Sequence, residues 1–430
     1  MGYSFFNIQK AKDSYNRKMK AFQSSLGASV CNGEDISFAD NDISYILKLQ
    51  HERIKEKGLT MDYEIYSRDE TRNDFIVGST WKDKHYESLV CSHQCGVKRT
   101  VKNNGRKCYK DNRKTIIYET ITDVLTDSHP DDELVSCPNC GNVSKIAELT
   151  EGCPHCNTKY KMDDLFPKIT SYYFIDDIGL AGSEGKNGIL ISTIIVAILH
   201  EFLYFIFNWR MFMPWYIIKN GFINQILGMF AVAILGVVIG YFGYTFFLVF
   251  RMFFIASSSS SGKGGTIGSR MKFENRMKKV SPDFSFEYFT SKAISLIKTA
   301  VYSKDERELL FYEGEALDSK MKDIIDMNYG AALGIVKFSE KDGYVTVVTK
   351  AFFDVLYAQD NKVYFKHKNF TATFKRRTDI PINMNFSMTR ISCPTCGSSF
   401  DATKNKFCPY CGNEYELISD DWILVELKEN

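Results

Sequence analysis

The chain carries almost no net charge: 54 lysines and arginines stand against 52 acidic residues, a formal charge of +2. A strongly basic balance is the usual footprint of nucleic-acid binding, so the chain as a whole lacks that footprint. Its start, MGYSFFNIQK, has no basic residue followed by the apolar run of a secretory signal peptide. The sequence also lacks a phosphate-binding glycine loop, a nucleophile–base pair and an open metal site. We therefore expect no enzyme.

Two long apolar runs interrupt this polar chain. Residues 189–208 contain one formal charge, Glu201, and residues 226–250 contain none. About 20 apolar residues at a rise of 1.5 Å cross a hydrocarbon core of about 30 Å, and the backbone must then satisfy its own hydrogen bonds. The sequence predicts two transmembrane helices in a hairpin. The alternative is a pair of buried helices in a soluble protein.

Basic residues set the expected orientation of this hairpin. The stretch after the second run is rich in lysine and arginine, whereas the short loop 209–225 holds only Arg210 and Lys219. Positive charge beside a membrane span marks the cytoplasmic face, so we expect both termini in the cytosol. Serine and glycine residues at 257–265 predict a flexible basic linker over 256–280. The basic residues are Arg251, Lys263, Arg270, Lys272, Arg276, Lys278 and Lys279.

Small residues lie on one face of the second apolar run. Gly236 and Gly240 form a small-xxx-small pattern that lets two helices approach closely. The partner is either the first run or a second copy of the protein, and the first is the simpler expectation. Glu201 falls near mid-membrane, where a charge is costly, so we expect it protonated or hydrogen-bonded inside the hairpin.

The strongest chemical pattern is a pair of four-cysteine motifs. Two Cys-Pro-x-Cys pairs separated by 12 residues occur before the hairpin, and two separated by 11 residues occur near the end. Such knuckles predict two structural zinc ions, because four thiolates fill a tetrahedral site and leave no position for water. Iron also accepts four thiolates and is the chemical alternative. The ligands are Cys137, Cys140, Cys153 and Cys156 in the first motif, and Cys393, Cys396, Cys408 and Cys411 in the second.

The flanks of the two motifs also match. Ser136 and Ser392 precede the first knuckles, and Tyr160 and Tyr415 follow the second ones at equal distance. Strand-like stretches come next, at 171–174 and 422–427. The sequence thus contains a repeated zinc ribbon, at 136–175 with its following strand and at 393–412. The repeat extends, by hypothesis, to a larger β unit that carries the ribbon.

The part before the first ribbon mixes helix and strand signals. Apolar residues between Ile8 and Phe22 recur at helical spacing among lysines and arginines, which suits either an anionic membrane surface or packing on the protein itself. A second helix is predicted from Asn41 to just before Gly58. We expect 1–60 to form a helical segment and 61–135 a β-leaning lobe with a turn at 103–105.

Two further features of this lobe have open interpretations. Residues 98–114 are locally basic and would contact phosphate groups or form a solvated hairpin. Cys91, His93 and Cys95 would share one face of a strand, with Cys108 beyond the turn. A third metal site there is conceivable, but the spacing is not that of a knuckle, so free thiols are the simpler expectation.

The last lobe, 281–430, reads as helices followed by strands. We expect a helix over 286–301, a second from 304 to 327, and strands at 331–338, 344–358, 363–375 and 422–427, with the second ribbon inserted before the last. The predicted fold class is α+β: a transmembrane hairpin between a mixed N-terminal lobe with a ribbon and a C-terminal domain of helices and antiparallel sheet.

The motifs Pro282-Asp283-Phe284-Ser285 and Asp421-Trp422-Ile423-Leu424, with Asp305 between them, resemble the Tim-forty-four-like domain family. The resemblance covers 281–430, about a third of the chain. It implies a cone-like fold of the nuclear-transport-factor-two type that binds lipid and protein at a membrane, without catalytic residues. The chain departs from the family in its hairpin and ribbons. It also has no mitochondrial presequence, so we expect a bacterial plasma-membrane protein.

These observations predict a membrane-anchored, cytosol-facing zinc-ribbon protein that acts as a scaffold. Membrane lipid and a protein at the cytosolic face are the expected partners, and a second copy through the Gly236/Gly240 face is an option. One alternative is a ribosome- or nucleic-acid-contacting module, which the balance of 19 basic against 22 acidic residues in 281–430 weakens. The other is a small-molecule-binding or enzymatic domain that uses the cone's concavity.

Overall fold

The computed structural model describes residues 5–68, 75–82, 86–124, 134–161, 165–176, 183–209, 213, 222–258, 266–282, 284–360, 362–380, 391–400, 407–419 and 421–430. The chain forms two compact units. One combines Met1–Asp176 with Gly265–Asn430, and the other is Asp177–Gly264. The two lobes expected on either side of the hairpin therefore belong to one unit, and the fold class is α+β with antiparallel sheets.

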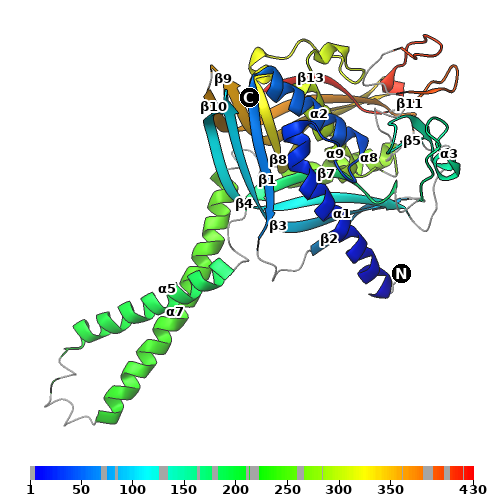
Figure 1. Ribbon diagram of the computed structural model, residues 1–430. Helices are drawn as coiled ribbons and strands as arrows, with labels where there is room; N and C mark the ends of the chain where they lie inside the picture. Colours follow the sequence, from blue (N-terminus) through cyan, green and yellow to red (C-terminus); the bar gives the residue numbers. More distant parts are fainter. Residues whose placement is uncertain are drawn as a thin grey trace. The chain divides into compact units, whose positions relative to one another are not determined.

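The first half of the large unit is built on a long antiparallel sheet (Figure 1). Its strands lie in the order β1-β3-β4-β7, and β2 also pairs with β3. The ribbon elements β5, β6 and α3 precede β7 in sequence. The bounds are α1 (Phe5–Asn32), α2 (Asn41–Glu56), β1 (Leu59–Ser67), β2 (Phe75–Lys82), β3 (Tyr86–Asn103), β4 (Arg106–Val124), β5 (Leu134–Ser136), β6 (Val143–Lys145), α3 (Ile146–Glu151) and β7 (Lys168–Asp176).

The second half repeats this plan. Its sheet has the order β13-β10-β9-β8, with the ribbon strands β11 and β12 inserted before β13. The bounds are α8 (Thr266–Val280), α9 (Phe286–Tyr302), η3 (Glu306–Glu308), η4 (Ser319–Asp323), β8 (Ile324–Lys341), β9 (Tyr344–Gln359), β10 (Lys362–Arg377), β11 (Ile391–Ser392), β12 (Ser399–Phe400), η5 (Leu417–Ser419) and β13 (Ile423–Glu429).

The correspondence between the halves extends beyond the sheet. In the second half β8, β9 and β10 form a meander; in the first half β1 and β2 both pair with β3, and β3 pairs with β4. In each half a ribbon follows, and the last strand pairs back with the long strand that precedes the ribbon. In each half a short segment after a helix also makes a parallel bridge to that last strand: Ala39 to Ile169, and Tyr312 to Leu424. The shared topology supports the hypothesis that the repeat covers a larger β unit and not the ribbon alone.

Local signals explain the elements that the sequence predicts well. Helix α2 begins where the side chain of Asp40 accepts a hydrogen bond from the backbone N–H of Asp42, and it is followed by Gly58 at φ 68°. The hairpin of β3 and β4 turns at Asn104 and Gly105, both with positive φ, as two-residue hairpin turns require. Both features confirm the prediction.

Burial decides between the two interpretations of the first helix. Tyr15, Met19, Phe22 and Leu26, at helical spacing, are buried on the large unit. They belong to an apolar cluster that also contains Ile325 and Leu356 of the second half. The described part of α1 therefore packs on the protein itself.

Two expectations about the second half are wrong. Residues 304–327 do not form one helix, because Phe311–Glu313 extends and bonds to the backbone of Leu424, and only short 3₁₀ turns flank it. The linker at 256–280 is not wholly irregular either. The second apolar helix, α7 (Phe222–Ser258), extends into this range, and α8 begins at Thr266. The buried Phe273 and Met277 give α8 an apolar face that its basic residues obscure in sequence.

The second unit is a pair of helices, α5 (Ser183–Phe207) and α7 (Phe222–Ser258). Both are long and apolar enough to cross a membrane. A Cβ on Gly236 would come within 2.9 Å of Cα of Ala197, and one on Gly240 within 2.8 Å of Cα of Thr193. The glycine face therefore packs on α5, which is the first of the two partners expected for it.

Glu201 lies on α5 inside this apolar pair. Its Oε1 atom is buried and finds no hydrogen-bond partner among the described residues. The neighbouring His200 is bonded elsewhere, with Nδ1 3.2 Å from the carbonyl oxygen of Val232. No second ionisable group of the described hairpin completes a relay with Glu201.

Candidate metal centres and the junction between the halves

The first ribbon brings its four cysteines together through two matching turns. The amide of Cys137 donates to the carbonyl of Asn142, and the amide of Gly141 donates back to the carbonyl of Cys137, both at 2.8 Å. The second knuckle repeats this at Cys153, whose carbonyl accepts from Asn157 at 2.8 Å. Gly141 has φ 74° and Asn157 has φ 59°, so each turn ends in the left-handed region, where glycine and asparagine are best tolerated.

The sulfur positions fit a tetrahedral metal. The Sγ atoms of Cys137 and Cys156 lie 3.6 Å apart, and those of Cys140 and Cys153 lie 3.8 Å apart. A zinc–sulfur bond of about 2.3 Å gives a tetrahedron with edges of about 3.8 Å. All four ligand atoms lie within 4.8 Å of one another. The first motif can therefore hold one metal ion without rearrangement.

The second ribbon has the same geometry. The Sγ atoms of Cys393 and Cys411 are 3.6 Å apart, and those of Cys396 and Cys408 are 3.7 Å apart. Both knuckles end in glycines of positive φ, Gly397 and Gly412. Four thiolates again fill the coordination sphere, so this is also a structural centre and offers no site for activating water. Zinc and iron both remain compatible with these donors.

Hydroxyl groups beside the cysteines favour the thiolate form. The hydroxyl of Thr158 lies 3.3 Å from Sγ of Cys156 and lowers the pKa of that thiol to about 6. Ser398 does the same for Cys396 in the second ribbon and also lowers its pKa to about 6. Each contact therefore favours the metal-binding form of one ligand, whereas the neighbouring thiols raise the pKa of Cys140 and of Cys411 to about 12.

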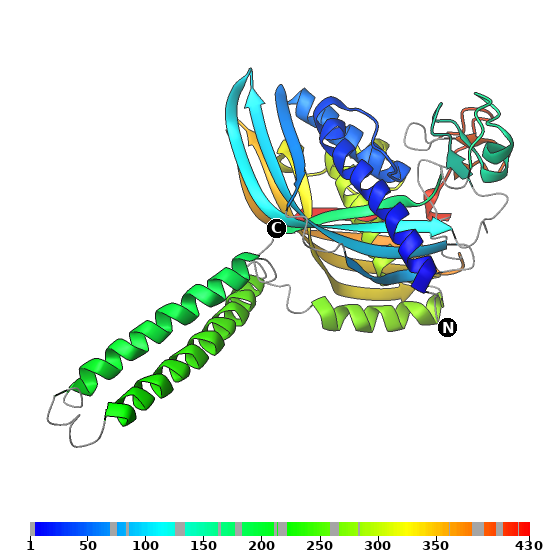
Figure 2. The same ribbon diagram turned by 60° about the horizontal axis from the view of Figure 1, so that its bottom comes forward.

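The two ribbons lie side by side, with β6 of the first against β12 of the second (Figures 1 and 2). Sequence spacing predicts each ribbon but not this pairing, because nothing in either motif encodes its neighbour.

The apolar residues that pack against the buried cysteines differ between the two ribbons. Cys137 and Cys153 belong to a separate small cluster with Ile146 and Leu149, whereas Cys393 and Cys408 belong to the large core of the second half.

The residues considered for a third metal site have other contacts. His93 Nε2 lies 3.1 Å from Sδ of Met19 and 3.6 Å from a carboxylate oxygen of Glu119. Sγ of Cys95 lies 3.3 Å from Oγ1 of Thr115, and burial raises the pKa of this thiol to about 11. Cys108 donates to the carbonyl of Val101. Where the structure describes the chain, Cys91, His93, Cys95 and Cys108 form no metal-binding group, and the two ribbons are the clusters present.

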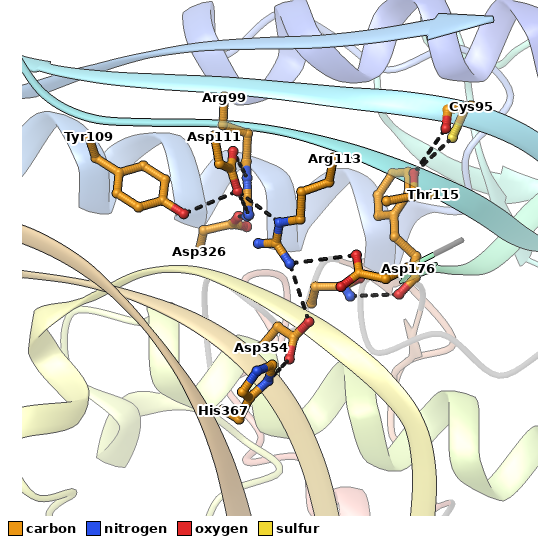
Figure 3. A network of polar contacts seen from close by, with 12 residues as sticks. Cys95, Arg99, Tyr109, Asp111, Arg113, Thr115, Asp176, Asp326, Asp354 and His367 are labelled. Atoms are coloured by element: carbon orange, nitrogen blue, oxygen red, sulfur yellow. Dashed lines mark hydrogen bonds and ion pairs between the residues drawn. The ribbon is translucent and has the colours of Figure 1, made fainter. Parts of the chain in front are cut away.

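Ion pairs hold four of the eight basic residues in the stretch 98–114. Lys98 lies 3.2 Å from Glu64, and Lys102 lies 2.6 Å from Asp62 on the neighbouring strand β1. Arg99 and Arg113 point into the molecule and bind carboxylates there (Figure 3). Arg106, Lys107 and Lys110, at and beside the turn, are exposed, and so is Lys114.

Arg99 and Arg113 join the halves of the large unit. Arg99 binds both carboxylate oxygens of Asp111, at 3.1 and 2.6 Å, and also pairs with Asp326 on β8 (Figure 3). Arg113 donates to Asp111 at 2.9 Å and lies 3.6 Å from Asp354 on β9. Burial alone would raise the pKa of Asp111, but the two guanidinium groups lower it. Asp111 is therefore ionised, and these ion pairs connect the two sheets.

Helix α2 makes a second connection across the junction. The guanidinium of Arg53 donates to the backbone carbonyls of Val301 and Ser303 at the end of α9, at 3.1 and 2.9 Å, and to that of Lys322 at 2.8 Å. These carbonyls follow helical or turn segments and would otherwise be unsatisfied inside the protein. The second half thus depends on a side chain about 250 residues away in sequence.

Two buried lysines on α9 have opposite surroundings. Lys292 lies 3.4 Å from both Asp42 and Asp421; burial favours its neutral form, but the surrounding Tyr288 and carboxylates outweigh this and raise its pKa. Lys298 lies 5.4 Å from the ring of Tyr172, and burial lowers its pKa to about 8 although the charge of Asp326 acts in the opposite direction. It lines a cavity of about 30 Å³ between the two halves.

Comparison of the chain with protein families, with curated proteins and with solved structures finds no match. The resemblance of residues 281–430 to the Tim-forty-four-like domain therefore stays a prediction. The metal-binding geometry and the apolar helix pair are observed in this chain and do not depend on a match to a known protein.

Proposed function

We propose that the protein is a membrane-anchored, cytosol-facing scaffold whose α5–α7 pair inserts into the bacterial plasma membrane. Large apolar side chains on both helices are exposed, among them Phe207 and Phe230, at 80% and 65%. A soluble protein rarely leaves such a continuous apolar surface uncovered, whereas lipid covers it without cost. Two zinc ions stiffen the large unit, and the reduced thiolates they need favour a cytosolic location.

The observation that carries this proposal is the outer face of α8. Phe273 and Met277 are buried, while Lys272, Arg276 and Lys279 are exposed beside Met271, which is 62% exposed. Within the described chain, Lys272 and Lys279 have no acidic partner. A helix that buries one apolar side and presents lysine, arginine and methionine on the other suits an anionic membrane surface.

Chain length keeps this face close to the membrane. Seven residues separate Ser258, the end of α7, from Thr266, the start of α8. Fully extended, that connection reaches at most about 28 Å. Each basic residue near an anionic leaflet contributes about 1 kcal/mol. The face of α8 is therefore the part of the large unit best suited to bind phosphate groups of lipid.

A photocrosslinking experiment tests this contact. The full-length protein, with a benzophenone residue in place of Met271, is reconstituted in anionic and in neutral vesicles. We expect lipid crosslinks that are stronger with anionic lipid and that fall in K272Q/R276Q/K279Q. The matched control R106Q/K107Q/K110Q removes the same charge from the exposed β3–β4 turn and should have no effect. Equal loss in both variants would sink the proposal.

Orientation has its own test. Both termini should lie in the cytosol, because the basic residues follow the second span and the ribbons need reduced thiolates. Protease added to intact cells should leave tags at both ends intact and digest them only after lysis. Cleavage of either tag in intact cells contradicts this orientation.

Two alternatives are less well supported. A nucleic-acid role would rest on residues 98–114, where half of the basic residues already form ion pairs with carboxylates. RNA binding that falls only in the variant R106Q/K107Q/K110Q would favour this role. A small-molecule role would rest on the cavity at Lys298, which at about 30 Å³ is far below the usual volume of a ligand pocket. The saturated metal centres also support a non-enzymatic role.

A further inference from the structure

The last strand of the second half has one edge that is only partly covered. Strand β13 pairs along one side with β10 and lies at the edge of its sheet. On its other side, the segment Phe311–Glu313 covers the start: the amide of Leu424 donates to the carbonyl of Phe311 at 2.7 Å, and the amide of Glu313 donates to the carbonyl of Leu424 at 3.0 Å. This short parallel bridge ends there.

Beyond the bridge, the chain moves away from the strand and a groove opens. A Cβ on Gly314 would lie 2.7 Å from the carbonyl oxygen of Val425, so the segment still touches β13 at this point. After it, a groove of about 740 Å³ separates residues 315–318 from Val425–Asn430. We call this the β13 groove.

The floor of the β13 groove offers unused backbone groups. The amide of Asn430 donates to the carbonyl of Asn369 on β10. Because antiparallel strands alternate their hydrogen-bonding direction, Leu427 and Glu429 direct their N–H and C=O groups away from β10. No described residue pairs with this part of the edge. Such an edge is a template for an added strand.

The corresponding strand of the first half has no such opening. The amide of Phe174 on β7 donates to Oδ1 of Asn328 at 2.9 Å, and the side-chain amide of Asn328 donates to the carbonyl of Phe174 at 2.8 Å. A side chain of the other half thus satisfies the edge of β7. The chain that follows the parallel bridge also differs between the halves. In the first half the bridge at Ala39 is followed by helix α2, whereas in the second half the bridge at Tyr312 is followed only by the short turn η4.

The β13 groove is acidic on one wall, which carries the exposed side chains of Glu313, Glu315 and Asp318. On the other wall, the two acidic residues already have lysine partners: Glu426 lies against Lys428, and Glu429 lies 2.6 Å from Lys368.

Glu429 contributes its backbone groups to the groove, but its carboxylate is already bound. Its side chain is only 9% exposed, and Oε1 is held by Tyr357 at 2.8 Å and Lys368 at 2.6 Å. Basic side chains of a segment bound in the groove would therefore face Glu313, Glu315 and Asp318.

We propose that the β13 groove binds an extended lysine- or arginine-rich peptide segment of a partner protein, which adds as a strand to Val425–Asn430. Backbone bonds to Leu427 and Glu429 give the affinity, and basic side chains facing the acidic wall of Glu313, Glu315 and Asp318 give the specificity. This names a partner class for the scaffold function proposed above and rests on it.

The test uses the full-length protein in detergent and a fluorescent seven-residue peptide of alternating lysine and threonine. We expect saturable binding that weakens with salt and falls about tenfold in E313Q/E315Q/D318N, because three acidic charges are lost. Asparagine at 318 keeps the oxygen that caps η4. The control E34Q/E151Q/E340Q removes three exposed acids elsewhere and should bind like the unmodified protein. Equal weakening in both triples overturns the location.

A second peptide tests strand addition itself. N-methylation at alternate residues removes the backbone donors but keeps every charge, so it should abolish binding. If the methylated peptide binds as well as the parent, the strand mechanism is wrong. The triple E313Q/E315Q/D318N should leave lipid crosslinking at position 271 unchanged. A protein that crosslinks to lipid at position 271 but does not bind the peptide would contradict the groove proposal alone. A protein that binds the peptide but does not crosslink to lipid would contradict the membrane proposal alone.

Discussion

The two halves of the large unit attach equivalent ribbons to different cores. In the first half, the ribbon carries its own short helix, α3, and its cysteines pack with Ile146 and Leu149 in a small separate cluster. In the second half, Cys393 and Cys408 pack with Ile391 and Phe400 inside the core that also holds α9 and the second sheet. The metal ligands and the turn geometry are the same in both.

This difference teaches that one motif can have two energetic roles. A ribbon with its own apolar cluster can lose its metal while the neighbouring sheet stays folded. A ribbon whose ligands belong to the main core cannot, because the metal-binding free energy is then part of the folding free energy of that core. Loss of the first metal ion should therefore unfold only its own ribbon, whereas loss of the second should destabilise the core of the second half.

The largest expected effect comes from replacing the third ligand of each ribbon, Cys153→Ser and Cys408→Ser. Both cysteines are fully buried. Loss of a structural zinc removes about 10 kcal/mol of apparent binding energy, comparable to the whole stability of a domain. We expect C408S to lose hydrogen-exchange protection throughout β9 and β10, and C153S to lose it only within the first ribbon. Equal losses would refute the difference in coupling.

Metal removal from the unmodified chain tests the same comparison reversibly. Elemental analysis should find two zinc ions per chain, and a strong chelator should remove both. Trp422 is buried in the core of the second half, with its ring 4.9 Å from that of Phe289. In a variant with Trp81, Trp209 and Trp215 changed to Phe, fluorescence should follow release of one ion only. A signal that tracks both ions equally, or a single ion per chain, contradicts the prediction.

A smaller effect should come from the apolar supports, Ile146→Ala and Ile391→Ala. Both side chains are almost completely buried, and truncating a buried isoleucine costs about 2–5 kcal/mol. We expect I391A to lower the midpoint of cooperative unfolding, measured by Trp422 fluorescence. I146A should change the free energy of unfolding reported by Trp422 by less than about 0.5 kcal/mol, because the two clusters are distant and independent of each other. A reversed order would mean that the clusters are misassigned.

The smallest effect should come from the hydrogen bonds that link the two knuckles of each ribbon. The side-chain amide of Asn139 donates to Thr158 at 3.0 Å, and that of Asn413 donates to Thr395 at 2.6 Å. Both asparagines are exposed, so Asn→Ala should cost about 0.5–1 kcal/mol in either ribbon. Here the two halves should behave alike in chemical denaturation. A large difference would show that coupling reaches beyond the core side chains.

Much of the candidate metal chemistry was predictable from the sequence. The ligands of each ribbon lie within 20 residues of one another, so a tight turn and a short return suffice to assemble them. The apolar pair α5 and α7 was predictable for a similar reason, since hydropathy and length alone define a membrane-crossing helix. Helix α2 carried a capping aspartate and a terminal glycine in its own sequence.

Sequence patterns failed where the pairing partner is distant or the composition misleads. Residues 304–327 have the polarity of an exposed helix, but Phe311–Glu313 is extended because Leu424, over 100 residues later, supplies its bonds. Helix α8 was hidden because two buried residues, Phe273 and Met277, are all that mark its inner face. The basic stretch 98–114 looked like a surface patch, yet Arg99 turns inward to Asp326 of the other half.

The sequence by itself determined the ribbons, the apolar helices and the strands of the second half, because each depends on spacing within a few turns of chain. Only the tertiary structure decided that the two lobes form one unit, that the ribbons lie together, and that the edge of β7 is closed while that of β13 is open. These features depend on contacts such as Arg53 with Ser303 and Phe174 with Asn328, which join residues 250 and 154 positions apart. A local pattern carries no information about which distant surface will meet it, and packing of the two halves supplies that choice.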